Sequence, residues 1–198
     1  MTGFGKPNVF PEVLNPIQLL IINLLTETIP SIALGLDSAE KDIMKRQAKL
    51  GQNLFERKLI VRIIWQGSYL FIISLIAYLL AIFVFKNQMY GHNPEHRGMT
   101  MGFLTIAISQ TFHALNMRSD KISIFSKANQ KNLLLPLLSG VSLVIIIILA
   151  MVSMYGGGEG TISILGMEPM GYAPWLTTIG LAISIIPTVE IAKKLKIN

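Results

Sequence analysis

The sequence predicts an all-α polytopic membrane protein, a bundle of five transmembrane helices. Hydrophobic residues make up 52% of the 198 residues and charged residues only 14%, and the mean hydropathy is +0.55. Soluble domains carry about 25% charged residues. The charged residues also fall between five apolar segments, each close to the roughly 20 residues that a helix needs to cross a bilayer. We therefore interpret residues 1–198 as a single membrane domain.

The composition also excludes several classes of function. The chain has no cysteine, so disulfides, thiolate metal sites and thiol redox chemistry are excluded. The net charge is +6, but the basic residues lie between apolar segments and are not interleaved with aromatic residues, so we expect no nucleic-acid partner. The chain start lacks a basic stretch followed by a short apolar run, so we expect no secretory signal.

The first two spans are predicted at residues 16–36 and 63–85. Residues 1–15 contain several glycines and prolines and read as a loop, after which Pro16 stands at a favoured helix-start position. The second span carries no charged residue over its whole length. The connection 37–58 is rich in charge and is compatible with a short cytoplasmic surface helix.

The remaining spans are predicted at residues 99–117, 133–155 and 173–192. The third is the most polar, and the fourth contains a long aliphatic run that is typical of a lipid-facing helix. The fifth contains Pro187 and is followed by a basic tail. The third span carries the following polar residues: Thr105, Ser109, Gln110, Thr111, His113 and Asn116.

The distribution of Lys and Arg predicts the topology. Six lie in 37–58, one is Arg62, four lie in 118–132 and three lie in the tail, whereas Lys6, Lys86 and Arg97 fall on the opposite side. Positive residues accumulate on the cytoplasmic side of a membrane. We therefore expect the N-terminus outside and the C-terminus in the cytoplasm.

The first span contains an acidic residue near its middle. An acid at that depth costs roughly 2.5–3.5 kcal/mol on insertion scales, which makes Glu27 a functional-site hypothesis. Asn23, Thr26, Glu27 and Pro30 are spaced i, i+3, i+4 and i+7, so helical periodicity puts them on one face. Pro30 cannot donate to the carbonyl of Thr26, so the helix is expected to kink or open there. The pattern predicts an all-oxygen cation site.

Other polar residues have a functional and a purely structural interpretation. Asn23 and Thr26 alone could simply form hydrogen bonds between helices. Gln110 lies mid-span and could complete a cation site, or could equally bond a neighbouring helix. His113 could ligate a metal, although packing is the commoner role of such a histidine. The chain contains no phosphate loop, nucleophile elbow or paired-acid arrangement.

Two stretches resemble a known family. The run from Asn15 to Gly35, continuing to Arg46, resembles the sixth membrane helix and following cytoplasmic loop of P-type cation ATPases, in particular bacterial calcium-transporting pumps. The run from Ser109 to Ser119 is similar to their eighth helix. The likeness covers about residues 14–196, and the last two spans match only in length and order. The chain therefore resembles the C-terminal membrane domain of such a pump, helices six to ten.

The resemblance implies a site and partners. Glu27 would be the charged ligand of a transported cation, Asn23 and Thr26 neutral ligands, and Gln110 a peripheral ligand where some members carry a glutamate. Calcium pumps usually have aspartate at the position of Glu27, and the extra methylene moves the carboxylate by about 1.5 Å. Calcium is expected rather than sodium or a proton. The family motifs for phosphorylation and nucleotide binding are absent, so this chain alone is not expected to hydrolyse ATP.

The resemblance also implies what must be supplied from outside this sequence. ATP and magnesium would act only through the remainder of the pump, which comprises helices one to five and the cytoplasmic domains. The location implied is the bacterial plasma membrane, with the lipid bilayer as the surroundings. Two other functions stay open on sequence alone. One is a non-catalytic membrane subunit or scaffold, and the other is a stand-alone channel or carrier, against which the lack of an internal repeat argues.

Overall fold

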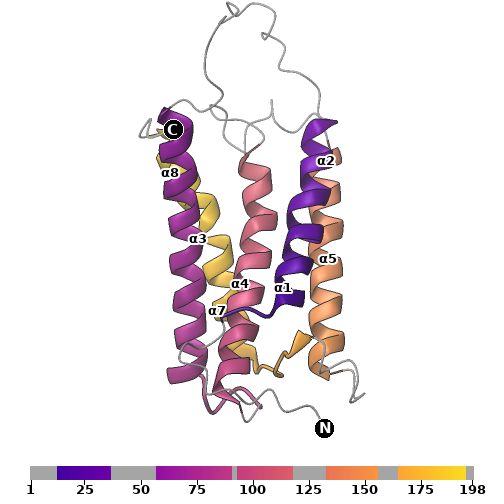
Figure 1. Cartoon of the computed structure of the whole chain (residues 1–198), viewed down its shortest axis with the longest axis vertical. Coiled ribbons are helices and arrows are strands. Elements are labelled where there is room, and N and C mark those ends of the chain that lie inside the picture. Colours follow the sequence, from indigo (N-terminus) through magenta and orange to yellow (C-terminus); the bar gives the residue numbers. More distant parts are fainter. Residues whose placement is uncertain (1–12, 37–56, 91–92, 118–132, 156–164, 195–198) are drawn as a thin grey trace, which may run out of the picture.

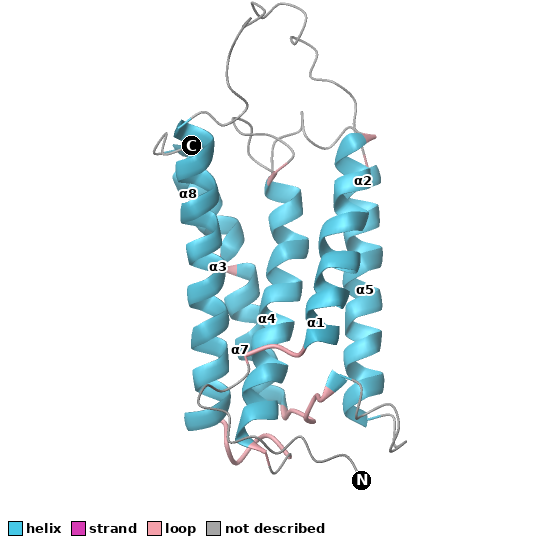
Figure 2. Ribbon diagram, viewed as in Figure 1, coloured by secondary structure: helices cyan, strands magenta, loops and turns pink. Residues whose placement is uncertain are grey.

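The protein is a bundle of helices aligned along one long axis (Figure 1). This computed structural model describes residues 13–36, 57–90, 93–117, 133–155 and 165–194. Within these ranges the regular secondary structure is helical (Figure 2). The one β-type pairing is an isolated antiparallel bridge between Met89 and Met170. The predicted all-α fold is confirmed.

The first span consists of three consecutive pieces. They are α1 (Pro16–Ile21), the π-helix η1 (Ile22–Thr28) and α2 (Ile29–Gly35). Asn15 caps α1, because its side chain accepts a hydrogen bond from the backbone N–H of Ile17 (3.1 Å) and its own N–H donates to Gln18 Oε1 (3.1 Å). Pro16 follows at the first helical position, where its missing N–H costs no hydrogen bond.

The next helices are α3 (Arg57–Phe83), α4 (Pro94–Asn116) and α5 (Leu134–Tyr155). α3 and α4 begin before the apolar stretches predicted at 63 and 99, because their first turns are polar yet still helical. At α4 the reason is a cap: Asn93 Oδ1 accepts from the backbone N–H of Glu95 at 3.0 Å, and Pro94 takes the first helical position.

The last span is also interrupted. It consists of α7 (Tyr172–Ile183) and α8 (Ile185–Lys194), which are separated at Ser184. Pro187 cannot donate to the carbonyl of Ile183, four residues earlier, so the ladder of backbone hydrogen bonds is broken at this point. The Ser184 hydroxyl lies 2.7 Å from the hydroxyl of Tyr69 on α3, which holds the break against the bundle.

The helix α4 occupies the centre of the bundle (Figure 1) and contacts α3, α5, α7, α8 and the first span. By length and composition, the described helices include four candidate membrane spans, Pro16–Gly35, Leu59–Phe83, Leu134–Tyr155 and Tyr172–Lys193, and α4 is not among them. Protein surrounds α4, so its surface need not match lipid. Three of its buried hydroxyls donate to its own backbone, four residues back: those of Thr100, Ser109 and Thr111.

Small residues allow α3 and α4 to approach closely. A Cβ placed on Gly98 would lie 2.5 Å from Cε2 of the buried Tyr78 ring, so only glycine fits at that position. Gly102, one turn later, faces Ser74. Such small residues drive helix packing in membranes because burial alone gives little driving force there.

Several sequence predictions lie outside the described residues. These are the surface helix within 37–58, apart from Arg57 and Lys58 at the start of α3, the basic loop 118–132 and most of the N-terminal loop. The side assignment of the termini, which depends on the basic residues of these segments, stays a prediction.

Candidate cation site

The turn before Pro30 is wider than an α-helix. η1 is a π-helix over residues 22–28 and carries Asn23, Thr26 and Glu27. Pro30 has no N–H for the carbonyl of Thr26, and hydroxyls compete for other carbonyls: Thr28 Oγ1 donates to the carbonyl of Asn23 at 3.0 Å. The opening predicted at Pro30 therefore takes the form of a π-helical segment, a feature frequent at functional sites.

Three of the four predicted ligands meet across two helices. Thr26 Oγ1 lies 2.5 Å from Gln110 Oε1, and Gln110 Nε2 donates to Glu27 Oε1 at 3.2 Å. Thr26 Oγ1 is also 2.6 Å from the carbonyl oxygen of Ile22. Thr26 is buried, whereas Gln110 is half-buried. The amide of Gln110 thus bridges the hydroxyl and the carboxylate from the facing helix.

The hydroxyl of Thr26 has more acceptors than protons. A hydroxyl carries one proton, so Thr26 can donate to either the carbonyl of Ile22 or the amide oxygen of Gln110, but not to both. The remaining short oxygen–oxygen contact has no proton between its atoms. Hard cations take oxygen ligands, so the oxygens of Thr26, Gln110 and Ile22 are of the kind that a metal ion such as calcium binds.

The fourth predicted ligand lies apart from the other three. Asn23 is exposed, and within the described residues its side chain forms no hydrogen bond to Thr26, Glu27 or Gln110, although α-helical spacing put it on one face with Thr26 and Glu27. The reason is the π-helix, whose longer turn rotates residues relative to the 3.6-residue period on which the prediction depended. Glu27 is also exposed, although its carboxylate reaches Gln110.

The site does not include a histidine cluster. In the described part of the chain, no group of three or more His, Cys, Asp or Glu residues could hold a metal ion. His113, one turn along α4 from Gln110, has a buried Nδ1 for which the described structure provides no hydrogen-bond partner. The chemistry available at the site is therefore that of carboxylate, amide, hydroxyl and carbonyl oxygens, which suits hard cations.

Sequence reasoning missed a further polar residue of the first span, Gln18. Gln18 is 0% exposed, and its Nε2 donates to the carbonyl of Leu165 at 2.7 Å. The pair Asn15 and Gln18 has the spacing of a capping box, and that signal could have found it. Its bond to Leu165 joins residues 147 positions apart, which no local pattern predicts.

The chain matches a known protein family over almost its whole length. The family described as "Cation transporting ATPase, C-terminus" matches residues 11–195. The chain belongs to this family. The resemblance inferred from residues 15–46 and 109–119 is confirmed, and this cation-transporting ATPase C-terminal domain is an integral membrane protein.

Similar proteins include full-length bacterial transporters. The domain is 30% identical over 195 residues to a calcium-transporting ATPase of Bacillus subtilis (strain 168), covering 97% of this chain and 20% of that protein. It is 28% identical over 194 residues to calcium-transporting ATPase 1 of Bacillus cereus, covering 91% of this chain and 21% of that protein. The chain therefore spans about a fifth of the length of these relatives.

Proposed function

We propose that this domain is the C-terminal membrane portion of an ATP-driven cation pump and supplies part of its intramembrane cation site. The carboxylate of Glu27 acts as the charged ligand, and the oxygens of Thr26, Gln110 and Asn23 act as neutral ligands. The observation that carries the proposal is the Gln110 bridge, which gathers Thr26 and Glu27 at a widened helical turn. An ion bound there replaces the Gln110–Glu27 bond with direct coordination.

Calcium is the cation that we propose. The Bacillus relatives are named as calcium-transporting, and an all-oxygen set with one carboxylate fits a hard divalent ion. Glu27 stands where calcium pumps usually have aspartate. Its longer side chain compensates for distance, because it reaches Gln110 on the neighbouring helix from an exposed position on η1.

The site is completed by other parts of the pump. Calcium takes 6–8 oxygen ligands, more than these four residues offer. The exposed side chains of Asn23 and Glu27 lie on the face of the first span that is open to further helices. Helices one to five supply the remaining ligands, and the cytoplasmic domains supply ATP, magnesium and the phosphorylated residue. The segment 37–58 couples those domains to the first span.

Transport then follows alternating access. Phosphorylation elsewhere in the pump shifts the neighbouring helices, and the broken helix at Pro30 lets the ligands separate, which lowers affinity for the ion. The domain lies in a bacterial plasma membrane, and the lower end of the bundle in Figure 1, where α1 begins, faces outward. The C-terminus is cytoplasmic.

The test uses a chimera in which this chain replaces the aligned C-terminal part of the Bacillus subtilis relative. Calcium-stimulated ATP hydrolysis and calcium uptake are measured in inverted membrane vesicles. Glu27→Gln removes the charge but keeps the shape, and uptake at subsaturating calcium should fall about tenfold or more, which corresponds to about 1.4 kcal/mol or more. Glu95→Gln, at the first turn of α4, is the matched control and should leave uptake unchanged.

Other outcomes would change the conclusion. Wild-type stimulation in the Glu27→Gln chimera would remove Glu27 from the site. Stimulation by sodium with none by calcium would replace the proposed ion. A chimera that assembles, binds the rest of the pump and shows no ion-stimulated activity at all would favour the non-catalytic scaffold.

A further inference from the structure

A short segment closes the lower end of the bundle. Residues 165–171, which we call the strap, lead into α7 and lie below the start of α1 and beside the lower part of α4 (Figure 1). Leu165, Met167 and Met170 are buried, Met167 to 1% exposure, although connecting segments usually lie on the surface. The backbone N–H of Gly171 also donates to the carbonyl of Gln88 at 2.8 Å. The strap is thus packed into the bundle.

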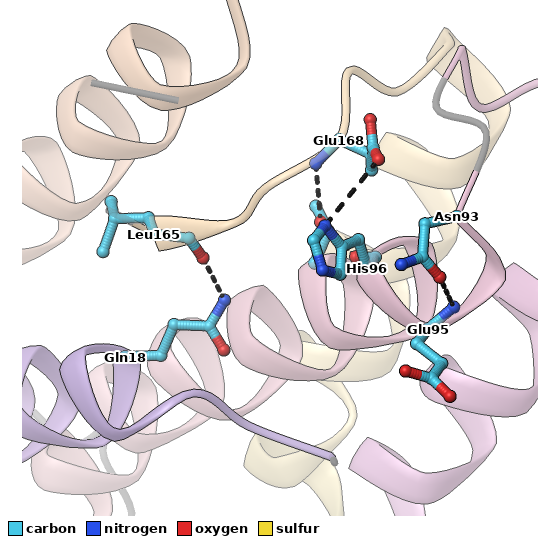
Figure 3. A network of polar contacts seen from close by, with 7 residues as sticks. Gln18, Asn93, Glu95, His96, Leu165 and Glu168 are labelled. Carbon is cyan, nitrogen blue, oxygen red and sulfur yellow. Dashed lines mark hydrogen bonds and ion pairs between the residues drawn. The ribbon is translucent and has the colours of Figure 1, made fainter. Parts of the chain in front are cut away.

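The strap is attached to the first span through Gln18. Figure 3 shows the Gln18 side chain pointing from α1 to the carbonyl of Leu165, to which Nε2 donates at 2.7 Å. The other end of the same amide accepts from the backbone N–H of Asn15. Both ends of a fully buried amide are therefore used, and the side chain has one favourable orientation.

The strap is attached to α4 through Thr100. The backbone N–H of Glu168 donates to Thr100 Oγ1 at 2.9 Å, and Thr100 in turn donates to the carbonyl of His96 at 2.7 Å. The Glu168 carboxylate faces His96 (Figure 3), and its Oε1 lies 3.9 Å from His96 Nδ1. Gly166 has a φ of +60°, a conformation that other residues rarely adopt, and this turn brings the strap against His96.

The two helices that the strap joins are the two that carry the proposed ligands. Thr26 follows Gln18 by eight residues, and Gln110 follows Thr100 by ten, so each ligand lies about two to three turns along its helix from the attachment of the strap. We therefore expect a change in separation at the strap to alter the contact between Thr26 and Gln110.

We propose that Gln18 is a positioning residue for the cation site, and that the strap sets the spacing between the helix of Thr26 and Glu27 and the helix of Gln110. This inference rests on the proposed function. A site must be held within about 0.5 Å of its productive geometry. Within the described bundle the first span packs against α4 and α5, and the Gln18 bond to the strap adds a polar tether to these contacts.

The first test compares Gln18→Leu with Gln66→Leu in the chimera. Both replace a buried glutamine by a residue of similar size, but Gln66 lies on α3, away from the strap. Gln18→Leu should raise the calcium concentration for half-maximal hydrolysis threefold to tenfold and leave the maximal rate within twofold. Gln66→Leu should change neither quantity. Gly166→Ala, which strains the strap without touching Gln18, should weaken apparent affinity in the same direction.

The second test measures helix spacing in the full chain, which has no native cysteine. Spin labels on Leu36→Cys and Met117→Cys, both exposed, report the distance between the upper ends of the two helices. Gln18→Leu should broaden or shift this distance, and Gln66→Leu should not. Equal effects of the two variants on affinity, or unchanged distances in Gln18→Leu, would overturn the inference. If Glu27→Gln fails to alter calcium dependence, the proposed function fails even where the spacing responds.

Discussion

The first span and α5 are covered by the rest of the bundle to the same extent, yet their compositions differ. In the most apolar 18-residue window of each, 28% of the residues are buried, but the mean hydropathy is 1.6 for Pro16–Gly35 and 2.8 for α5. On α5 most of the exposed large side chains are aliphatic, such as Val144 and Ile148. On the first span the exposed residues include Asn23 and Glu27. The two spans are therefore buried to the same extent, but their exposed sides differ in polarity.

The difference in exposed residues indicates which of the two helices has a surface suited to contact with lipid. α5 places its polar side chains inward, since Ser139, Ser142 and Ser153 are buried, and its aliphatic residues outward. The first span carries polar groups on both sides, Thr26 inward and Glu27 outward. A charged group facing hydrocarbon is costly, so the proposed pump would place protein, and not lipid, against the outward side of the first span.

The strongest test of this comparison exchanges the two residue types. Val144→Glu puts a charge at the middle of α5 and should cost roughly 2.5–3.5 kcal/mol of insertion free energy, while Glu27→Val should return a similar amount to the first span. Insertion of each segment is measured by glycosylation mapping in a host membrane protein. In the full chain, Val144→Glu should also reduce the yield of folded protein.

Val144→Leu is the control, because it keeps the exposed surface aliphatic and should leave insertion and yield unchanged. A full-length pump that tolerates Val144→Glu as well as it tolerates Val144→Leu would show that the exposed side of α5 does not face lipid. The inference that α5 and the first span face different surroundings would then be wrong.

Sequence reasoning predicted the fold because hydropathy and charge placement act over whole segments. The helix boundaries that it did not predict depend on local contacts. The start of α4 at Pro94 depends on a cap at Asn93, and the first turn of α3 at Arg57 is helical despite its charges. An apolarity criterion does not detect either boundary, since polar turns at a helix end need no burial in hydrocarbon.

Only part of the candidate site could be predicted, because the sequence shows polar residues within apolar spans but not their tertiary contacts. Thr26, Glu27 and Gln110 were identified as polar residues within apolar spans, and the structure brings them together. Asn23 stands apart because the π-helix changes the period of the turn. Gln18 was missed because its partner lies across the bundle, and only tertiary structure brings it to Leu165.

A smaller effect is expected from closing the π-helical turn. Pro30→Ala restores an N–H that can bond the carbonyl of Thr26, so η1 should convert toward an α-helix and the chain should gain about 1–2 kcal/mol of stability. Because the same change closes the widened turn that carries Thr26 and Glu27, the calcium concentration for half-maximal activity should rise. Thermal unfolding and calcium-dependent hydrolysis measure the two effects.

Pro136→Ala in α5 is the matched control. Pro136 lies in the first turn of α5, where backbone N–H groups have no partner within the helix, so its replacement restores no hydrogen bond. Both stability and calcium dependence should stay within error of the wild type. If Pro30→Ala leaves calcium dependence unchanged as well, the widened turn has no part in ion binding.

The smallest expected effects on stability come from removing single hydroxyl groups. We compare a hydroxyl that contacts another helix with one that bonds only within its own helix. Thr26 Oγ1 reaches Gln110 on α4, whereas Ser142 Oγ on α5 donates to the carbonyl of Leu138, one turn back. Thr26→Val keeps the shape and should cost about 1 kcal/mol, because it removes an interhelical bond and leaves the amide of Gln110 with one partner fewer. A loss of this size should lower the melting temperature by about 2–4 °C.

Ser142→Ala should cost less than about 0.5 kcal/mol, since the carbonyl of Leu138 keeps its backbone hydrogen bond in the helix. Thermal unfolding of the purified chain in detergent compares the two variants. Equal losses would mean that the Thr26–Gln110 contact adds nothing to the packing of the first span. The position of that span would then depend on the strap and on apolar contacts, and the oxygens of Thr26 and Gln110 would be free to serve the ion.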